Sequence, residues 1–291
     1  MLKLEGVSKY FSKRKIIHSI DLIINKPLIY GLLGPNGAGK TTTIRMICGI
    51  IDVDSGNIYR DKNFNLKSIG YMPEEAGLYK DMSILDEILY FGRLHNISKE
   101  KTLLTANPLI EQFKLSNELN KPVSALSKGT SRKVQFICTL IHEPQFIILD
   151  EPFSGLDPLS SEIMEKELLK LKSEGKTIVL STHRMEHAEI FCDHIFIINN
   201  GKMILDETLQ NIKANNMKNS YEIHVLDELK FETYVDYFKT DADTCFKYIV
   251  KLDNNFTYKQ LISTLSGNKI LFFKQETPTL KEIFLHITSK K

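Results

Sequence analysis

A glycine-rich stretch at residues 34–42 constrains this chain more than any other part of its sequence. It reads GPNGAGKTT and matches the pattern G-x-x-x-x-G-K-[ST] at every position. The apolar run at residues 28–33 is typical of a buried parallel strand. After the loop, isoleucines recur at the spacing of one helix face, at Ile44, Ile47, Ile50 and Ile51. Strand, glycine-rich loop and helix in this order predict a phosphate-binding loop rather than an ordinary glycine turn.

The residues of this loop have distinct expected roles. Glycines let backbone N–H groups close around phosphates, and the N-terminus of the following helix adds partial positive charge. Lys40 is expected to reach the β- and γ-phosphates, and Thr41 to ligate Mg²⁺. The sequence therefore predicts a nucleotide site that includes Asn36, Gly37, Ala38, Gly39, Lys40, Thr41 and Thr42.

Composition limits the partners that this site can serve. The chain has 291 residues, of which 42% are hydrophobic and 25% charged, and its net charge is +2. These values fit a globular protein with room for one large and one small domain, and they give no excess of basic charge to indicate nucleic acid. Four scattered cysteines predict reduced thiols in a cytoplasmic protein. Because no apolar stretch approaches the roughly 20 residues of a spanning helix, a membrane role would need a partner.

Two adjacent carboxylates narrow the chemistry. Asp150 and Glu151 follow the apolar run at residues 146–149, so both are expected at the carboxyl end of a buried strand beside the loop. Asp150 can then hold Mg²⁺ while Glu151 polarises the attacking water. The two motifs together predict nucleotide hydrolysis.

A helical block separates the two motifs. Its limits are expected at about residues 76–143, with Ser83 as the cap of the first helix and a second helix interrupted at Asn107 and Pro108. Domain boundaries are predicted from composition: one domain over residues 1–212, a polar linker at 213–220, and a small α+β accessory domain at 221–291. This last domain is expected to end in a helix that begins around Pro278.

Further motifs make the chain resemble the nucleotide-binding subunit of ABC transporters. Residues 126–130 read LSKGT and resemble the family's LSGGQ signature, with departures at Lys128 and Thr130. Residues 154–157 resemble the D-loop, which ends in Asp157, and His183 resembles the switch histidine. Phe11 falls where the family places an aromatic that stacks on adenine. The resemblance implies an α/β P-loop NTPase (RecA-like) core with an antiparallel β subdomain and an inserted helical subdomain.

The same resemblance implies how the site works. In the family, two ATP-binding subunits, either identical or different, pair head to tail, so Ser127 and Gly129 of one chain would cap the ATP of the other. His183 would approach the γ-phosphate, and Asp157 would lie close to the nucleotide. An integral membrane subunit is the other implied partner, which would hold the chain at the inner face of the cell membrane. The segment at residues 277–285 resembles one in ATPases of two-component exporters of drugs, peptides or ions.

One position departs from the family in a way that bears on the metal. Where the family usually has a glutamine that reaches Mg²⁺, this chain has Glu74. A carboxylate is a harder ligand than an amide but adds negative charge near the γ-phosphate. We expect Glu74 to ligate Mg²⁺ and to link the site to the membrane partner.

Three alternatives are compatible with parts of the pattern. Residues 183–187 also spell H-x-x-E-H, a zinc-peptidase pattern, but His183 is expected at the end of a strand and not on a helix. A soluble ABC-type ATPase that acts on ribosomes or DNA is the second, although the chain has one P-loop and no long heptads. A GTPase is disfavoured because the sequence lacks Asn-Lys-x-Asp.

Overall fold

The phosphate-binding loop is held by a six-stranded sheet with the order β5-β6-β7-β3-β8-β9. Its strands are β3 (Ile29–Leu33), β5 (Ile69–Met72), β6 (Phe146–Asp150), β7 (Thr177–Thr182), β8 (His194–Asn199) and β9 (Lys202–Thr208). All pairs are parallel except β8 with β9. Every residue of β3 is buried, as an inner parallel strand covered on both faces requires. The carboxyl ends of β3, β6 and β7 therefore meet at one edge of the sheet.

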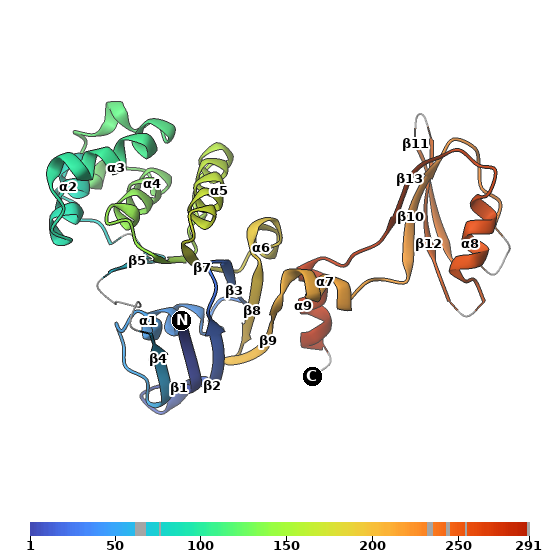
Figure 1. Ribbon diagram of the computed structural model, residues 1–291, viewed down its shortest axis with the longest axis horizontal. Coiled ribbons are helices and arrows are strands. Elements are labelled where there is room, and N and C mark those ends of the chain that lie inside the picture. The colour runs from blue at the N-terminus through green and yellow to red at the C-terminus, as the bar shows by residue number, and fades with distance from the viewer. Residues whose placement is uncertain (62–67, 76, 232–234, 243–244, 254, 290–291) are drawn as a thin grey trace. The chain divides into compact units, whose positions relative to one another are not determined.

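The computed structural model describes residues 1–291 except 62–67, 76, 232–234, 243–244, 254 and 290–291. The chain divides after Leu209 into two units, Met1–Leu209 and Gln210–Lys291 (Figure 1). Residue 76, the first of the predicted helical block, lies outside the described residues. None of the helices that the structure describes has the length and apolar character needed to span a bilayer.

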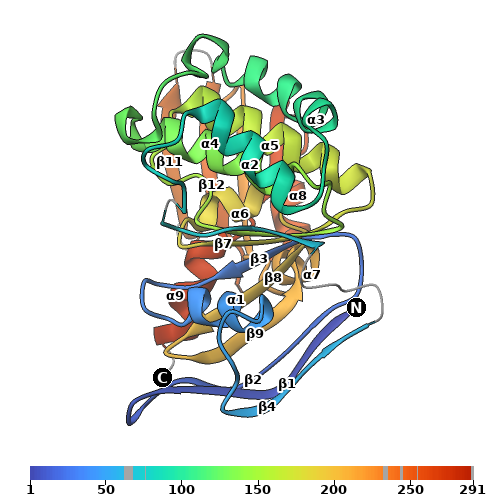
Figure 2. The same cartoon turned by 90° about the vertical axis from the view of Figure 1, so that its left-hand side faces the viewer.

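A second, antiparallel sheet packs in the first unit, with the order β2-β1-β4. It consists of β1 (Leu2–Phe11), β2 (Arg14–Ile24) and β4 (Ser55–Arg60). Helix α1 (Lys40–Ile47) lies between the two sheets (Figure 2), and its buried side chains share one apolar core with both. Ile44 and Ile47 are buried there as predicted, but Ile50 is 55% exposed. Its predicted place on the helix face is wrong because the helix ends at Ile47, just before Gly49 at φ +68°.

Five of the described helices lie on the side of the six-stranded sheet opposite to the antiparallel sheet (Figure 1). The first three belong to the inserted block, and the last two follow it in the chain. They are α2 (Ile84–Leu94), α3 (Lys99–Gln112), α4 (Lys128–Leu140), α5 (Pro158–Ser173) and α6 (Met185–Phe191). Short 3₁₀ turns lie at Ser116–Glu118 and Val123–Ala125. The Ser83 side chain caps α2 by accepting a hydrogen bond from the Asp86 N–H, as predicted.

Helix α3 corrects one expectation. It runs without interruption through Pro108, where a break was predicted. Proline removes the hydrogen bond that its N–H would donate to the carbonyl of Leu104. Both residues lie on the exposed side of α3, and Leu104 is 75% exposed, so water can hydrate that carbonyl.

The second unit is a four-stranded antiparallel sheet with the order β11-β12-β10-β13. Its elements are α7 (Leu209–Asn215), β10 (Ser220–Val225), β11 (Tyr237–Ala242), β12 (Cys245–Lys251), α8 (Tyr258–Leu265), β13 (Ile270–Gln275) and α9 (Leu280–Ser289). Leu261 and Leu265 of α8 pack in one core with Ile223, Tyr248 and Val250 of the sheet. The predicted linker at 213–220 is too long, because α7 extends to Asn215 and β10 begins at Ser220. Strand β11 was not predicted.

Candidate nucleotide site

Two glycines give the loop between β3 and α1 its shape. Gly34 has φ +151°, and a Cβ there would lie 2.1 Å from the carbonyl oxygen of Ile198. Gly39 has φ +110°, and a Cβ there would lie 2.5 Å from the Cδ1 atom of Ile17. Both φ values belong to the region that favours glycine. The loop can therefore pass close to β8 and β2 only with glycine at these two positions.

Lys40, the first residue of α1, points back into the loop. Its side chain is 7% exposed, and its Nζ donates hydrogen bonds to the carbonyls of Gly34 (2.8 Å) and Pro35 (3.2 Å). The same Nζ lies 3.9 Å from Oε1 of Glu151. Burial lowers the pKa of the Lys40 ammonium, and nearby carboxylates, led by Glu151, oppose that shift. The loop carbonyls thus hold the Lys40 ammonium against the loop, with the Glu151 carboxylate close to it.

Asp150 ends β6 in a fully buried position. One carboxylate oxygen accepts a hydrogen bond from the Ser181 hydroxyl. The other, Oδ2, is buried and has no hydrogen-bond partner among the described residues. A buried carboxylate oxygen left open in this way fits the ligand role predicted for a hard cation.

The set of donors around Asp150 also fits Mg²⁺. Thr41 and Glu74 line the same cavity as Asp150, so hydroxyl and carboxylate oxygens face one space. The described residues contain no cluster of three or more His, Cys, Asp or Glu side chains that could hold a metal ion. Mg²⁺ commonly takes few protein ligands and completes its shell with water and substrate phosphates, so the oxygens of Thr41, Glu74 and Asp150 on one cavity fit it.

Glu151 is fixed by the end of β7. Its carboxylate oxygen Oε1 accepts a hydrogen bond from the His183 backbone N–H (2.8 Å) and lies 2.7 Å from His183 Nδ1. Thr182 Oγ1 donates to the other oxygen at 3.3 Å. Glu151 has φ +49°, an uncommon conformation that surrounding contacts must maintain. The structure thus brings the predicted water-polarising carboxylate and the predicted switch histidine into direct contact.

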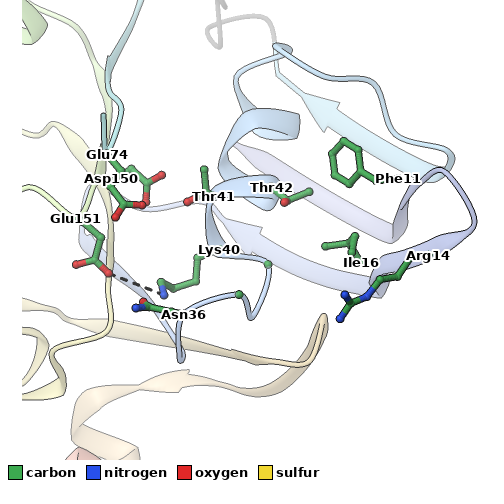
Figure 3. A pocket seen from close by; sticks show the side chains of 12 residues that line it. Phe11, Arg14, Ile16, Asn36, Lys40, Thr41, Thr42, Glu74, Asp150 and Glu151 are labelled. Atoms are coloured by element: carbon green, nitrogen blue, oxygen red, sulfur yellow. Dashed lines mark ion pairs between the residues drawn. The ribbon is translucent and has the colours of Figure 1, made fainter. Parts of the chain in front are cut away.

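A cavity of about 600 Å³ connects these groups (Figure 3). Phe11 and Arg14 lie at one end of it, and Glu74, Asp150 and Glu151 lie at the other. Its lining consists of Phe11, Arg14, Ile16, Asn36, Gly37, Gly39, Lys40, Thr41, Thr42, Glu74, Asp150 and Glu151. Phe11 is 49% exposed, so an aromatic ring is available for stacking. Ala38 is buried within the loop and does not line the cavity.

The remaining predicted residues lie outside this cavity. Ser127 caps α4 by accepting a hydrogen bond from the Thr130 N–H, and a Cβ on Gly129 would lie 2.7 Å from the Gly155 carbonyl. Asp157 caps α5, and hydrogen bonds from Ser160 lower its pKa to about 2. Ser127, Gly129 and Asp157 do not line the cavity that contains Lys40. The signature segment and the D-loop segment instead pack against each other.

Sequence reasoning missed four residues of the site. Arg14 and Ile16 come from β2 and line the cavity, and Ser181 holds Asp150. Arg132 is buried beneath the carboxylates, where it donates to the backbone oxygens of Asp150 and Glu151. In the sequence, the only sign of this role is that Arg132 is a charged residue among the apolar positions of α4. That pattern does not predict which residues Arg132 contacts.

The H-x-x-E-H alternative does not fit the geometry. His183 follows β7 and contacts Glu151, whereas His187 lies on α6 with its Nδ1 3.8 Å from Glu165. The two imidazoles are not on one helix, so they do not form the zinc-binding pair of that motif.

Comparisons with known proteins agree with this geometry. Residues 17–154 match the family described as ABC transporter, and residues 208–288 match the family described as ATP-binding protein DrrA1-3-like, C-terminal domain. An uncharacterized ABC transporter ATP-binding protein, YhaQ of Bacillus subtilis (strain 168), is 36% identical over 290 residues, covering 98% of this chain and 97% of its own. Nod factor export ATP-binding protein I of Burkholderia lata is 29% identical, with coverage of 98% and 96%.

A solved structure of an ATP binding subunit of an ABC transporter superposes with a TM-score of 0.68 at 29% identity. It covers 74% of this chain and 92% of its own. The chain therefore belongs to the ABC transporter ATP-binding proteins, the ATPases that are coupled to transport.

Proposed function

We propose that this chain dimerises on ATP and powers export of a drug, peptide or ion through a separate transmembrane subunit. One observation carries the proposal: the cavity contains the loop lysine and the carboxylates but not Ser127 or Gly129. A single chain would therefore contact the γ-phosphate from one side only, through the loop lysine and the carboxylates. A second chain, placed head to tail, supplies the other through the N-terminus of its α4.

Within one chain, each group has a task that its position supports. Lys40 binds the β- and γ-phosphates, and Phe11 stacks on the adenine at the far end of the cavity. Thr41, Asp150 and Glu74 hold Mg²⁺, which neutralises phosphate charge when it is bound. Glu151 orients and polarises the attacking water, and His183 holds the Glu151 carboxylate in place.

The proposed direction of transport rests on relatives. One full-length relative is named as a Nod factor export protein, and another, 32% identical over 70% of this chain, as a linearmycin resistance protein, LnrL of Bacillus subtilis. The second unit matches a domain described as DrrA1-3-like. The first name specifies export and the second specifies resistance to linearmycin, and an exporter is compatible with both. The chain itself works at the cytoplasmic face of the membrane, bound to its transmembrane subunit.

Glu151→Gln tests the dimer. With ATP and Mg²⁺ this variant should bind nucleotide, lose hydrolysis by at least about 100-fold and elute as a dimer, because the closed state no longer decays. The measurement is size-exclusion chromatography with light scattering, alongside phosphate release. Lys40→Ala is the matched control and should stay monomeric, since it weakens phosphate binding. A Glu151→Gln chain that stays monomeric at saturating ATP would contradict the shared site.

A further inference from the structure

Arg132 is a buried cation that forms no ion pair with a carboxylate among the described residues. Its side chain lies on α4 and is 2% exposed. Its guanidinium instead donates to backbone carbonyls of Pro73 (2.7 Å), Glu151 (2.7 Å) and Asp150 (3.3 Å). A buried charge is costly unless hydrogen bonds and nearby opposite charge compensate it, so this arrangement calls for an explanation.

The carbonyls that Arg132 contacts belong to two separate parts of the site. Asp150 and Glu151 are at the end of β6, whereas Pro73 follows β5 and directly precedes Glu74. Gln135, one turn further along α4, accepts from Arg132 at 3.0 Å. Its Nε2 donates to the carbonyls of Pro73 and Glu75, both at 3.1 Å. One helix thus fixes the backbone on each side of Glu74 together with the residues that end β6.

The surrounding charges explain why a cation is tolerated here. Burial lowers the pKa of the Arg132 guanidinium, and the carboxylates of Glu74, Asp150 and Glu151, in that order, oppose the shift. Glu74 stands where the family usually has a neutral glutamine. The chain therefore carries one more negative charge at this site than the family pattern, with a buried arginine behind it.

We propose that Arg132 is a positioning residue of the ATPase site. It fixes the positions of Glu74, Asp150 and Glu151 relative to one another and offsets the extra negative charge of Glu74. This role rests on the proposed function of those carboxylates. Since α4 begins beside Ser127, the same helix also connects the chain's own carboxylates to the segment that would cap the partner's ATP.

A double-mutant cycle on the purified full chain tests this role. Arg132→Gln should lower kcat for ATP hydrolysis about 100-fold, which is the effect expected when catalytic groups are displaced from their productive positions. The KM for ATP should change by no more than about threefold. In the Glu74→Gln background the same substitution should cost about tenfold or less, because the charge that Arg132 offsets is gone. Equal fold losses in the two backgrounds would overturn the proposal. Arg93→Gln, an exposed arginine on α2, is the matched control and should leave kcat unchanged.

Arg132→Lys separates charge from geometry. Lysine keeps the charge but lacks the planar fork that reaches several carbonyls at once. We expect its kcat to fall by more than about threefold at an unchanged thermal unfolding midpoint, and a smaller loss would overturn the positioning role. This variant also decides the question if Arg132→Gln does not fold. Absence of ATP hydrolysis in the unsubstituted chain would instead contradict the proposed function, which keeps the two failures distinct.

Discussion

At the residue scale, Glu87 on α2 is another ionisable group inside the protein, and it has fewer polar contacts than Arg132. It is fully buried, and its Oε1 accepts a hydrogen bond from the Tyr79 N–H at 3.1 Å. Its Oε2 has no partner among the described residues. Burial therefore raises the pKa of the Glu87 carboxyl above its ordinary value of 4.5.

This raised pKa predicts a pH-dependent stability. Folding favours protonated Glu87, so its contribution to stability is complete below the unfolded-state pKa and is lost as pH rises through the folded-state pKa. Glu87→Gln should thus stabilise the chain at pH 7.5 by about 1 kcal/mol, with a smaller gain at pH 4.5. Urea unfolding at both pH values measures the difference, with the exposed Glu111→Gln as control. A gain independent of pH would show that charge is not the cause.

Residues differ in how far the sequence predicts them. Lys40, Thr41, Asp150 and Glu151 belong to short contiguous motifs whose geometry follows from one strand end and one loop. Ser181 and Arg132 reach the same site from other elements, and their partners are 31 and 18 positions away in the chain. Such contacts depend on tertiary packing, so no local pattern could assign them.

At the element scale, helices α2 and α3 meet through a glycine. A Cβ on Gly92 would lie 2.1 Å from Oγ1 and 2.9 Å from Cγ2 of Thr102, which is 1% exposed. The close approach explains a glycine near the end of a helix whose other positions favour helix formation. It also sets how tightly the inserted block packs.

Gly92→Ala should destabilise the chain by about 1–2 kcal/mol, because overpacking of 1–3 kcal/mol exceeds the gain in helix propensity of about 1 kcal/mol. Thr102→Ala in the same chain should recover most of that loss, since it removes both clashing atoms. Thermal unfolding of the two single variants and the double variant measures this. A stabilising Gly92→Ala would mean that the two helices move apart freely.

Elements were predicted well where nearly every position is apolar and buried, and poorly where other features decide. The apolar runs at residues 28–33 and 146–149 correspond to β3 and β6, in which all or nearly all residues are buried. Helix α3 was predicted with a break that it does not have, and strand β11 was not predicted. Helix α3 tolerates Pro108 because that residue lies on the exposed side of the helix. Only half of the residues of β11 are apolar, so its sequence shows little periodicity.

At the scale of the whole molecule, the proposed shared site predicts that two defective chains can complement each other. Lys40→Ala removes the loop lysine, and Ser127→Arg is expected to block the signature contact across the dimer. In a head-to-tail pair of these two variants, one site has both defects and the other has none. Mixing equal amounts should restore ATP hydrolysis to at most about half of the parent rate, because each mixed pair has one intact site of two. Each variant alone should be nearly inactive, and a mixture with no gain would contradict the shared geometry.

The strand order has a consequence for how this protein is made. β3, which leads into the phosphate-binding loop, pairs only with strands that come far later in the chain: Ile29 pairs with Ile178, and Tyr30 with His194. A ribosome therefore synthesises the loop and the whole inserted block before β3 has either neighbour. Such long-range pairing slows folding and leaves apolar strands uncovered in the nascent chain. The ability to hold ATP should appear abruptly during translation, once β7 and β8 have emerged.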